Sequence, residues 1–219
     1  MIFRDRAEAG RSLAWRLGKY ANRHDVAVLA VPRGGVPVAF EIAEALRAPL
    51  DVFLLRKLGV PGHEEFAFGA IASGGVRVLD PHILRTLAIV PSELEAIISE
   101  AEQELKRQEI TYRHSEPPLS VAGEIAILVD DGIATGASLL AGVRALRQLQ
   151  PRKIVVAVPV AHAPVAERLA YEVDEMVCLA TPEPFGAVGW FYDDFSQIED
   201  EEVIELLARN RRTESATAA

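Results

Sequence analysis

The sequence predicts an α/β protein, built as a three-layer α/β/α sandwich around a mostly parallel central sheet. Apolar, strand-like runs alternate with helical patterns along the 219 residues, as a parallel sheet with helical crossovers requires. The runs at 26–31, 125–129 and 153–160 are apolar almost throughout, which is typical of strands covered on both faces. Half of the residues are hydrophobic, which is enough for the core of one domain.

Helices are expected where apolar residues recur at helical spacing, as Ala9, Leu13 and Leu17 do near the N-terminus. The predicted helices span 5–23, 36–47, 91–112, 137–149, 164–171 and 201–208. Strands are expected at short apolar runs bounded by turn-forming residues. The predicted strands span 26–31, 50–55, 68–72, 76–79, 125–129, 153–160 and 175–179. A Pro- and Gly-containing loop is expected at 59–65, and a disordered tail at 210–219.

Composition and charge exclude several classes of protein. The formal net charge is −9 and no basic stripe is present, so no nucleic-acid partner is expected. Cys178 is the only cysteine, which excludes an internal disulfide. The N-terminal residues carry charges where a secretory signal needs an apolar stretch, and no apolar run approaches the roughly 20 residues of a membrane helix. We therefore expect a soluble, cytoplasmic protein with no membrane partner.

The run 127–140 carries the chemistry. A strand ends at two adjacent carboxylates, Asp130 and Asp131, and a loop of small residues leads into the next helix. Ligands of open parallel sheets bind at the carboxyl ends of strands, and free backbone N–H groups before a helix suit a phosphate. The predicted phosphate-binding residues are Ala134, Thr135, Gly136, Ala137 and Ser138. Paired carboxylates beside such a loop fit a ribose 5-phosphate, through its hydroxyl groups or through Mg²⁺, whereas a helix cap explains only one of them.

This run resembles the binding motif for 5-phosphoribosyl-1-pyrophosphate (PRPP) in the type I phosphoribosyltransferases: a hydrophobic strand, two acidic residues and a Thr-Gly-x-Ser loop. The resemblance covers most of residues 25–195. It implies the PRTase-like fold, with one antiparallel edge strand and a small hood formed by the two ends of the chain. It also implies Mg²⁺ as the cofactor, with Asp130 and Asp131 as catalytic residues that hold the ribose hydroxyls or the metal ion.

Two basic segments belong to the site that the resemblance implies. Arg33, Gly34 and Gly35 follow the first strand, where the family has its pyrophosphate loop, often with a strained or cis peptide bond. Taken alone, these residues fit a tight turn between a strand and a helix equally well. Arg56 and Lys57 end the second strand. They would neutralise the leaving pyrophosphate, or they form a solvated strand end.

The segment 184–194 resembles the hood of the hypoxanthine/guanine enzymes, in which an aromatic residue near a Val-Gly pair stacks on the base. By this resemblance Phe185 or Trp190 stacks on a planar acceptor, and Asp193 lies near the metal ion or the base. A hydrophobic clamp that packs the C-terminal segment onto the sheet stays open as the alternative. The stretch 156–161 has no lysine where the purine enzymes read a 6-oxo group, so the acceptor stays open as well.

We therefore expect one domain over residues 1–209, with a hood from 1–24 and 181–209 and a helical insertion at 81–118. The expected activity is transfer of the 5-phosphoribosyl group from PRPP to a nitrogen nucleophile, such as a nucleobase, with release of pyrophosphate. The long charged helix of the insertion suggests a homodimer contact. Two alternatives stay open: a catalytically silent, PRPP-sensing regulator on the same fold, and a pyrophosphokinase, for which no ATP site is identifiable.

Overall fold

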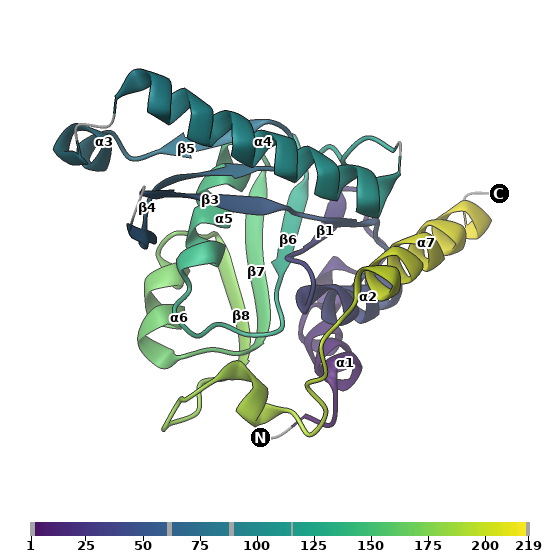
Figure 1. Cartoon of the computed structure of the whole chain (residues 1–219). Helices are drawn as coiled ribbons and strands as arrows, with labels where there is room; N and C mark the ends of the chain where they lie inside the picture. Colours follow the sequence, from purple (N-terminus) through teal and green to yellow (C-terminus); the bar gives the residue numbers. More distant parts are fainter. Residues whose placement is uncertain (1–2, 61–62, 88–89, 115, 218–219) are drawn as a thin grey trace.

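Five parallel strands form the centre of the structure, a computed structural model that describes the chain except residues 1–2, 61–62, 88–89, 115 and 218–219 (Figure 1). The strand order is β2-β1-β6-β7-β8, and every described pairing in this sheet is parallel. The strands are β1 (Val26–Ala30), β2 (Leu50–Val52), β6 (Ile125–Val129), β7 (Lys153–Val160) and β8 (Glu175–Ala180). Every residue of β1 and β6 is buried, as their unbroken apolar runs predicted.

Helices cover both faces of this sheet, which confirms the predicted three-layer architecture. Figure 1 shows α1, α2 and α7 on one face and α5 and α6 on the other. Their bounds are α1 (Arg6–Arg16), α2 (Gly35–Leu46), α5 (Ala137–Gln148), α6 (Ala163–Ala170) and α7 (Asp200–Thr217), with short 3-10 helices η1 (Gly18–Tyr20) and η2 (Val188–Phe191). None of the helices in the described part of the chain has both the length and the apolar character that crossing a membrane requires.

A second, antiparallel sheet packs beneath the helical insertion. It contains β3 (Leu55–Val60), β4 (His63–Ala72) and β5 (Val76–Leu79), and the insertion contains α3 (Pro81–Leu87) and α4 (Pro91–Arg113). Figure 1 shows α4 lying across this sheet. The expected antiparallel strand at the edge of the main sheet is therefore wrong, because the antiparallel strands form a sheet of their own. The expected loop at 59–65 is also wrong for residues 59–60 and 63–65, since β3 and β4 extend into it and pair there, with irregular register near Gly59. Residues 61–62 lie outside the described part of the chain.

The last helix is longer than the sequence predicted. A helix was expected at 201–208 with a disordered tail from 210, but α7 continues to Thr217. Asn210 explains the difference: its side chain is buried, and its Oδ1 accepts a hydrogen bond of 3.0 Å from the N–H of Leu50 at the edge strand β2. Val203 and Leu207 bury the same face of α7 against the core. The helix is thus held by tertiary contacts that its polar composition does not show.

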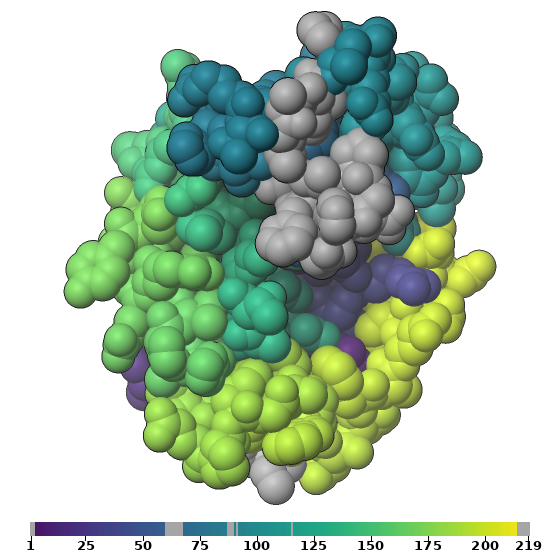
Figure 2. Space-filling model, turned by 60° about the vertical axis from the view of Figure 1, so that its left-hand side comes forward, coloured from purple at the N-terminus to yellow at the C-terminus, as the bar shows by residue number. Residues whose placement is uncertain are grey.

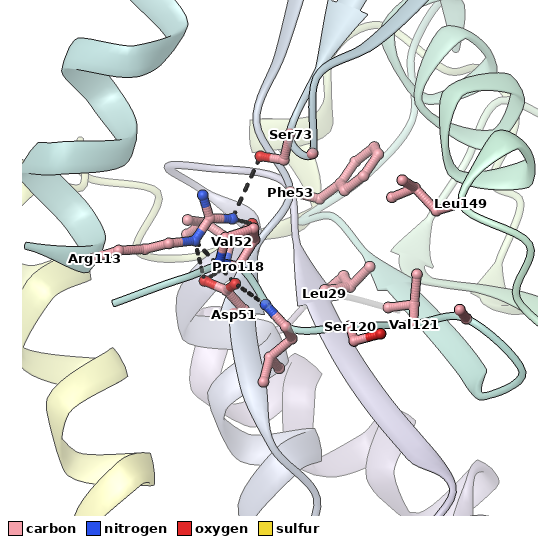
Figure 3. Close-up of a pocket in the computed structure, with 13 residues that line it drawn as sticks. Leu29, Asp51, Val52, Phe53, Ser73, Arg113, Pro118, Ser120, Val121 and Leu149 are labelled. Carbon is pink, nitrogen blue, oxygen red and sulfur yellow. Dashed lines mark hydrogen bonds and ion pairs between the residues drawn. The ribbon is translucent and has the colours of Figure 1, made fainter. Parts of the chain in front are cut away.

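A buried ion pair fixes the end of α4 to the central sheet (Figure 3). The Nε of Arg113 lies 2.9 Å from each carboxylate oxygen of Asp51 on β2. The same guanidinium donates to the carbonyl of Val52 at 2.6 Å, and the N–H of Leu119 donates to Asp51. Both side chains are nearly inaccessible to solvent, at 3% and 6% exposure. The pair borders a largely apolar cavity of about 220 Å³ and sets the position of the insertion.

Replacing Arg113 with Leu is expected to destabilise the fold strongly, because the Asp51 carboxylate stays buried without its cation. Breaking one partner of a buried pair typically costs about 3–5 kcal/mol. Arg107 on the same helix is a matched control, since its ion pair with Glu104 is exposed and such pairs are worth about 0–1 kcal/mol. Urea unfolding of R113L and R107L measures the loss of stability in each variant. Equal midpoints for the two variants would show that the Arg113 pair does not anchor the insertion.

Candidate active site

Two carboxylates follow β6 at the edge of the sheet where its parallel strands end. The N–H of Asp131 donates to Oδ1 of Asp130 at 2.8 Å, so the two residues form one tight unit. Burial, together with the neighbouring Asp131 charge, raises the pKa of Asp130 well above its usual range. Burial also raises the pKa of Asp131, although the hydrogen bond from Arg6 opposes this shift. The pair therefore forms a site that favours protons or cations.

Arg6, in the first turn of α1, is the cation that this pair meets. Its Nε donates to Oδ2 of Asp131 at 2.8 Å, and the two side chains are only 9% and 15% exposed. The same guanidinium donates to the carbonyl of Ser196 at 2.9 Å and lies 3.9 Å from the centre of the Phe195 ring. Arg6 was not among the site residues predicted from the sequence. The available signal was its position on the same helical face as the buried residues Ala9, Leu13 and Leu17.

The turn at Arg33, Gly34 and Gly35 packs directly against the acidic pair. A Cβ atom on Gly34 would lie 2.1 Å from Oδ2 of Asp131, and one on Gly35 would lie 2.8 Å from the carbonyl of Val129. The peptide bond between Pro32 and Arg33 is cis, as the family resemblance implied. The structure thus brings the two motifs together, with glycine at the points of closest approach.

The loop 134–138 lies beside the acidic pair and leads into α5. Gly136 precedes this helix with φ of +70°, and a Cβ there would meet Val165 at 2.3 Å. In the part of the chain that the structure describes, no hydrogen bond uses the hydroxyl of Thr135 or Ser138, and both side chains are exposed. Ala134 and Ala137 are exposed as well. A loop of exposed small residues at a helix N-terminus is suited to a phosphate.

The predicted cations lie in different surroundings. Arg33 is paired with Glu199 at 3.3 Å and lies 3.9 Å from Asp200, at the start of α7. Together with Ser138 it lines a cavity of about 270 Å³ that reaches from the Pro-Arg-Gly-Gly turn to α5. Arg56 pairs with Glu104 of the insertion at 3.5 Å, and Lys57 is exposed.

The C-terminal part of the predicted hood, residues 181–199, closes the site from the other side. Figure 2 shows this segment in yellow-green below the teal and green chain that contains the acidic loop. Tyr192 donates from its hydroxyl to the carbonyl of Asp131 at 2.6 Å. Val188 packs so closely on the loop that a Cβ on Gly132 would lie 2.5 Å from it. These contacts hold the segment against the acidic pair.

The aromatic residues of this segment divide into packed and exposed ones. The Phe185 ring lies 5.2 Å from the ring of Phe191 and 5.7 Å from that of His162, so it packs in a half-buried aromatic cluster. The Trp190 ring is 66% exposed. Asp193 is exposed, and its N–H donates to the carbonyl of Phe3 at 2.8 Å, tying the two ends of the chain together.

The chemistry of the residues present fits a magnesium ion. Mg²⁺ prefers carboxylate oxygens and keeps several waters or phosphate oxygens as its remaining ligands. Asp130 and Asp131 supply a largely buried carboxylate pair of this kind. Among the described residues, no group of three His, Cys, Asp or Glu side chains is placed to hold a metal, so Asp193 does not join the pair.

This site lies at the edge of a parallel sheet and combines an acidic pair, a glycine turn and an exposed loop. The protein is therefore of the α/β class, with a site suited to a phosphorylated sugar. The chain belongs to the phosphoribosyl transferase domain family, because the model of that family matches residues 3–190. Similarity to individual proteins agrees with this family. The crystal structure of TT1426 from Thermus thermophilus has 43% sequence identity and a TM-score of 0.85, over 95% of this chain and 99% of that chain.

Two curated proteins of Mycobacterium tuberculosis, from strains CDC 1551 / Oshkosh and ATCC 25618 / H37Rv, are also similar. Each is named "Putative phosphoribosyl transferase", and each is 45% identical over 211 residues. The match covers 96% of this chain and 47% of theirs, so the chain spans about half the length of the curated relatives it matches.

Replacing Asp130 with Asn is expected to raise the thermal stability of the metal-free protein at neutral pH. A carboxyl group whose pKa is raised on folding stabilises the fold below its unfolded pKa, near 3.9, and this contribution is lost as the pH rises through the folded pKa. An asparagine at position 130 cannot ionise, so the variant avoids this loss of stability at neutral pH. The melting temperature should rise at pH 7 by about 2–4 °C for each kcal/mol relieved, and the gain should disappear near pH 3.

Asp25→Asn is the control of opposite sign for this measurement. Hydrogen bonds from Arg23 and Arg152 lower the pKa of Asp25, so its ionised form stabilises the fold. Its replacement is expected to lower the melting temperature at pH 7. A D130N variant that melts at or below the wild-type temperature at pH 7 would contradict the raised pKa of Asp130.

Proposed function

We propose that the chain binds PRPP together with Mg²⁺ and transfers the 5-phosphoribosyl group to a nitrogen nucleophile, with release of pyrophosphate. One observation carries the proposal: the turn at 33–35 packs onto the acidic pair 130–131, directly beside the exposed loop 134–138. A ligand on this surface meets a cation, two carboxylates and a phosphate-binding loop. These are the features that a phosphorylated pentose carrying a diphosphate needs.

Each segment has a separate part in this mechanism. The loop 134–138 donates backbone N–H groups to the 5′-phosphate, with the hydroxyls of Thr135 and Ser138 as further donors. Asp130 and Asp131 accept hydrogen bonds from the ribose hydroxyls, which fixes the sugar for attack at C1. When bound by the acidic pair, Mg²⁺ neutralises charge on the diphosphate. The bond from C1 to the diphosphate oxygen breaks as the bond to nitrogen forms, through an oxocarbenium-like transition state.

Arg33 stabilises the charge that develops on the leaving pyrophosphate, and Arg56 and Lys57 add positive charge nearby. The acceptor is a planar, nucleobase-like molecule. Trp190 supports it better than Phe185, because the Trp190 ring is exposed whereas the Phe185 ring packs against Phe191. The homodimer and the cytoplasmic location stay predictions.

Calorimetric titration of PRPP with and without Mg²⁺ tests this function, followed by a screen of nucleobases for pyrophosphate release. Magnesium-dependent binding with release for one base is the expected result. Binding without release for any base would favour the PRPP-sensing regulator, and no binding would remove the proposal.

Asp131→Asn is expected to lower kcat/KM at least about 100-fold, because a contact that positions the reacting sugar is lost. Asp174→Asn serves as a control, because that carboxylate pairs with Arg147 on another part of the surface. Unchanged kinetics for D131N, with the base identified in the screen, would contradict the role of the acidic pair.

A further inference from the structure

The inner face of α4 carries one polar residue in an otherwise apolar stripe. Ile98, Ala101, Leu105 and Tyr112 are buried along this face. Gln108 lies three residues after Leu105 and four before Tyr112, so it belongs to the same face. Gln108 itself is half-buried, so its polar amide lies at the edge of this apolar face.

The Gln108 side chain opens onto the cavity beside the glycine turn. This cavity of about 270 Å³ is lined by Gln108 and Tyr112 from α4, by Pro32 and Arg33 from the turn, and by Ser138 at the start of α5. An adjoining hollow of about 390 Å³ also contains Gln108, Tyr112 and Arg33. Within the described part of the chain, the amide of Gln108 makes no hydrogen bond. Its donors and acceptor are thus free to meet a ligand.

Arg33 is the charged side chain that lines this cavity, so it is the group there that can attract an anion. In this structure Glu199 and Asp200 lie against its guanidinium. Tyr112 donates to Asp200 at 2.5 Å, which fixes the carboxylate beside Arg33. Exposed carboxylates already occupy the place where a ligand anion would go. A neutral amide adds hydrogen-bond donors to such a place without adding negative charge.

The position of Gln108 is set by the anchor at the end of its helix. Arg113, five residues further along α4, is held by Asp51 and by the carbonyl of Val52. Tyr112, next to Arg113 in the chain, is buried as well. The inner face of α4 is therefore fixed over the cavity, as a preorganised binding residue requires.

We propose that Gln108 of the insertion donates from its side-chain amide to the diphosphate group of PRPP. This inference rests on the proposed function and adds a substrate-binding residue to it. The diphosphate is the part of the ligand that matches, because the cavity contains Arg33 and borders the phosphate loop at Ser138. None of the described residues 181–199, where the proposed acceptor-stacking ring lies, lines this cavity.

Calorimetry with Mg²⁺ on the full chain tests this assignment with three probes: PRPP, inorganic pyrophosphate and ribose 5-phosphate. Gln108→Glu places a negative charge in the cavity and is expected to weaken PRPP and pyrophosphate binding at least about tenfold, a change of about 1.4 kcal/mol. Ribose 5-phosphate, which lacks the diphosphate, should bind within about twofold of wild type. Gln108→Leu removes the donors without adding charge and should weaken the same two probes by a smaller factor.

Gln103→Glu is the matched control, because Gln103 is exposed on the same helix and its amide donates to the hydroxyl of Ser99 at 3.4 Å. It adds the same charge to α4 and should leave all three affinities unchanged. Pyrophosphate binding by Q108E at wild-type strength would overturn the inference, as would an equal loss of ribose 5-phosphate binding. A wild-type protein that binds ribose 5-phosphate but not pyrophosphate would overturn it too. Failure of the wild-type protein to bind PRPP would instead remove the proposed function.

Discussion

The burial of the Asp131 carboxylate is the constraint on which the rest of the site depends. An ionised carboxylate taken out of water must be paired, and here the partner is Arg6, from the N-terminal helix. The same oxygen atom, Oδ2, lies so close to Gly34 that no side chain fits there. Two segments far from Asp131 in sequence, at Arg6 and at Gly34, thus fix the position of this oxygen atom. The N-terminal helix is thereby a structural part of the site, even though none of its residues resembles a known motif.

The same constraint explains the role of the segment 181–199. Two of its polar contacts hold the ion pair in place: Tyr192 donates to the carbonyl of Asp131, and the carbonyl of Ser196 accepts from Arg6. The Phe195 ring covers the Arg6 guanidinium. Tyr192 and Phe195 therefore help to hold the pair of Arg6 and Asp131 in place. The Trp190 ring, by contrast, is 66% exposed, which is why the proposed function assigns the acceptor to it.

The sequence predicted the buried strands well, because their positions depend on local apolar runs. The runs 125–129 and 153–160 became β6 and β7 with the predicted bounds, because strands buried on both faces need unbroken apolar sequence. The acidic pair follows β6 and the glycine turn follows β1, as expected, because the same apolar runs locate the ends of these strands. Arg6 and the extension of α7 were missed, because both depend on long-range contacts. The sequence around Asn210 is typical of a polar tail, and it does not show that the Asn210 side chain accepts a hydrogen bond from the N–H of Leu50.

The two arginines nearest the acidic pair differ in how readily they exchange partners. Arg6 and Asp131 form a buried pair, and separating such a pair costs about 3–5 kcal/mol. Arg33 and Glu199 are 39% and 61% exposed, and pairs of this kind are worth about 0–1 kcal/mol. Under the proposed function, Arg33 can therefore exchange Glu199 for a phosphoryl group at little cost, whereas Arg6 stays paired with Asp131. In that proposal Arg33 is the cation that meets the ligand, and Arg6 keeps the Asp131 carboxylate in place.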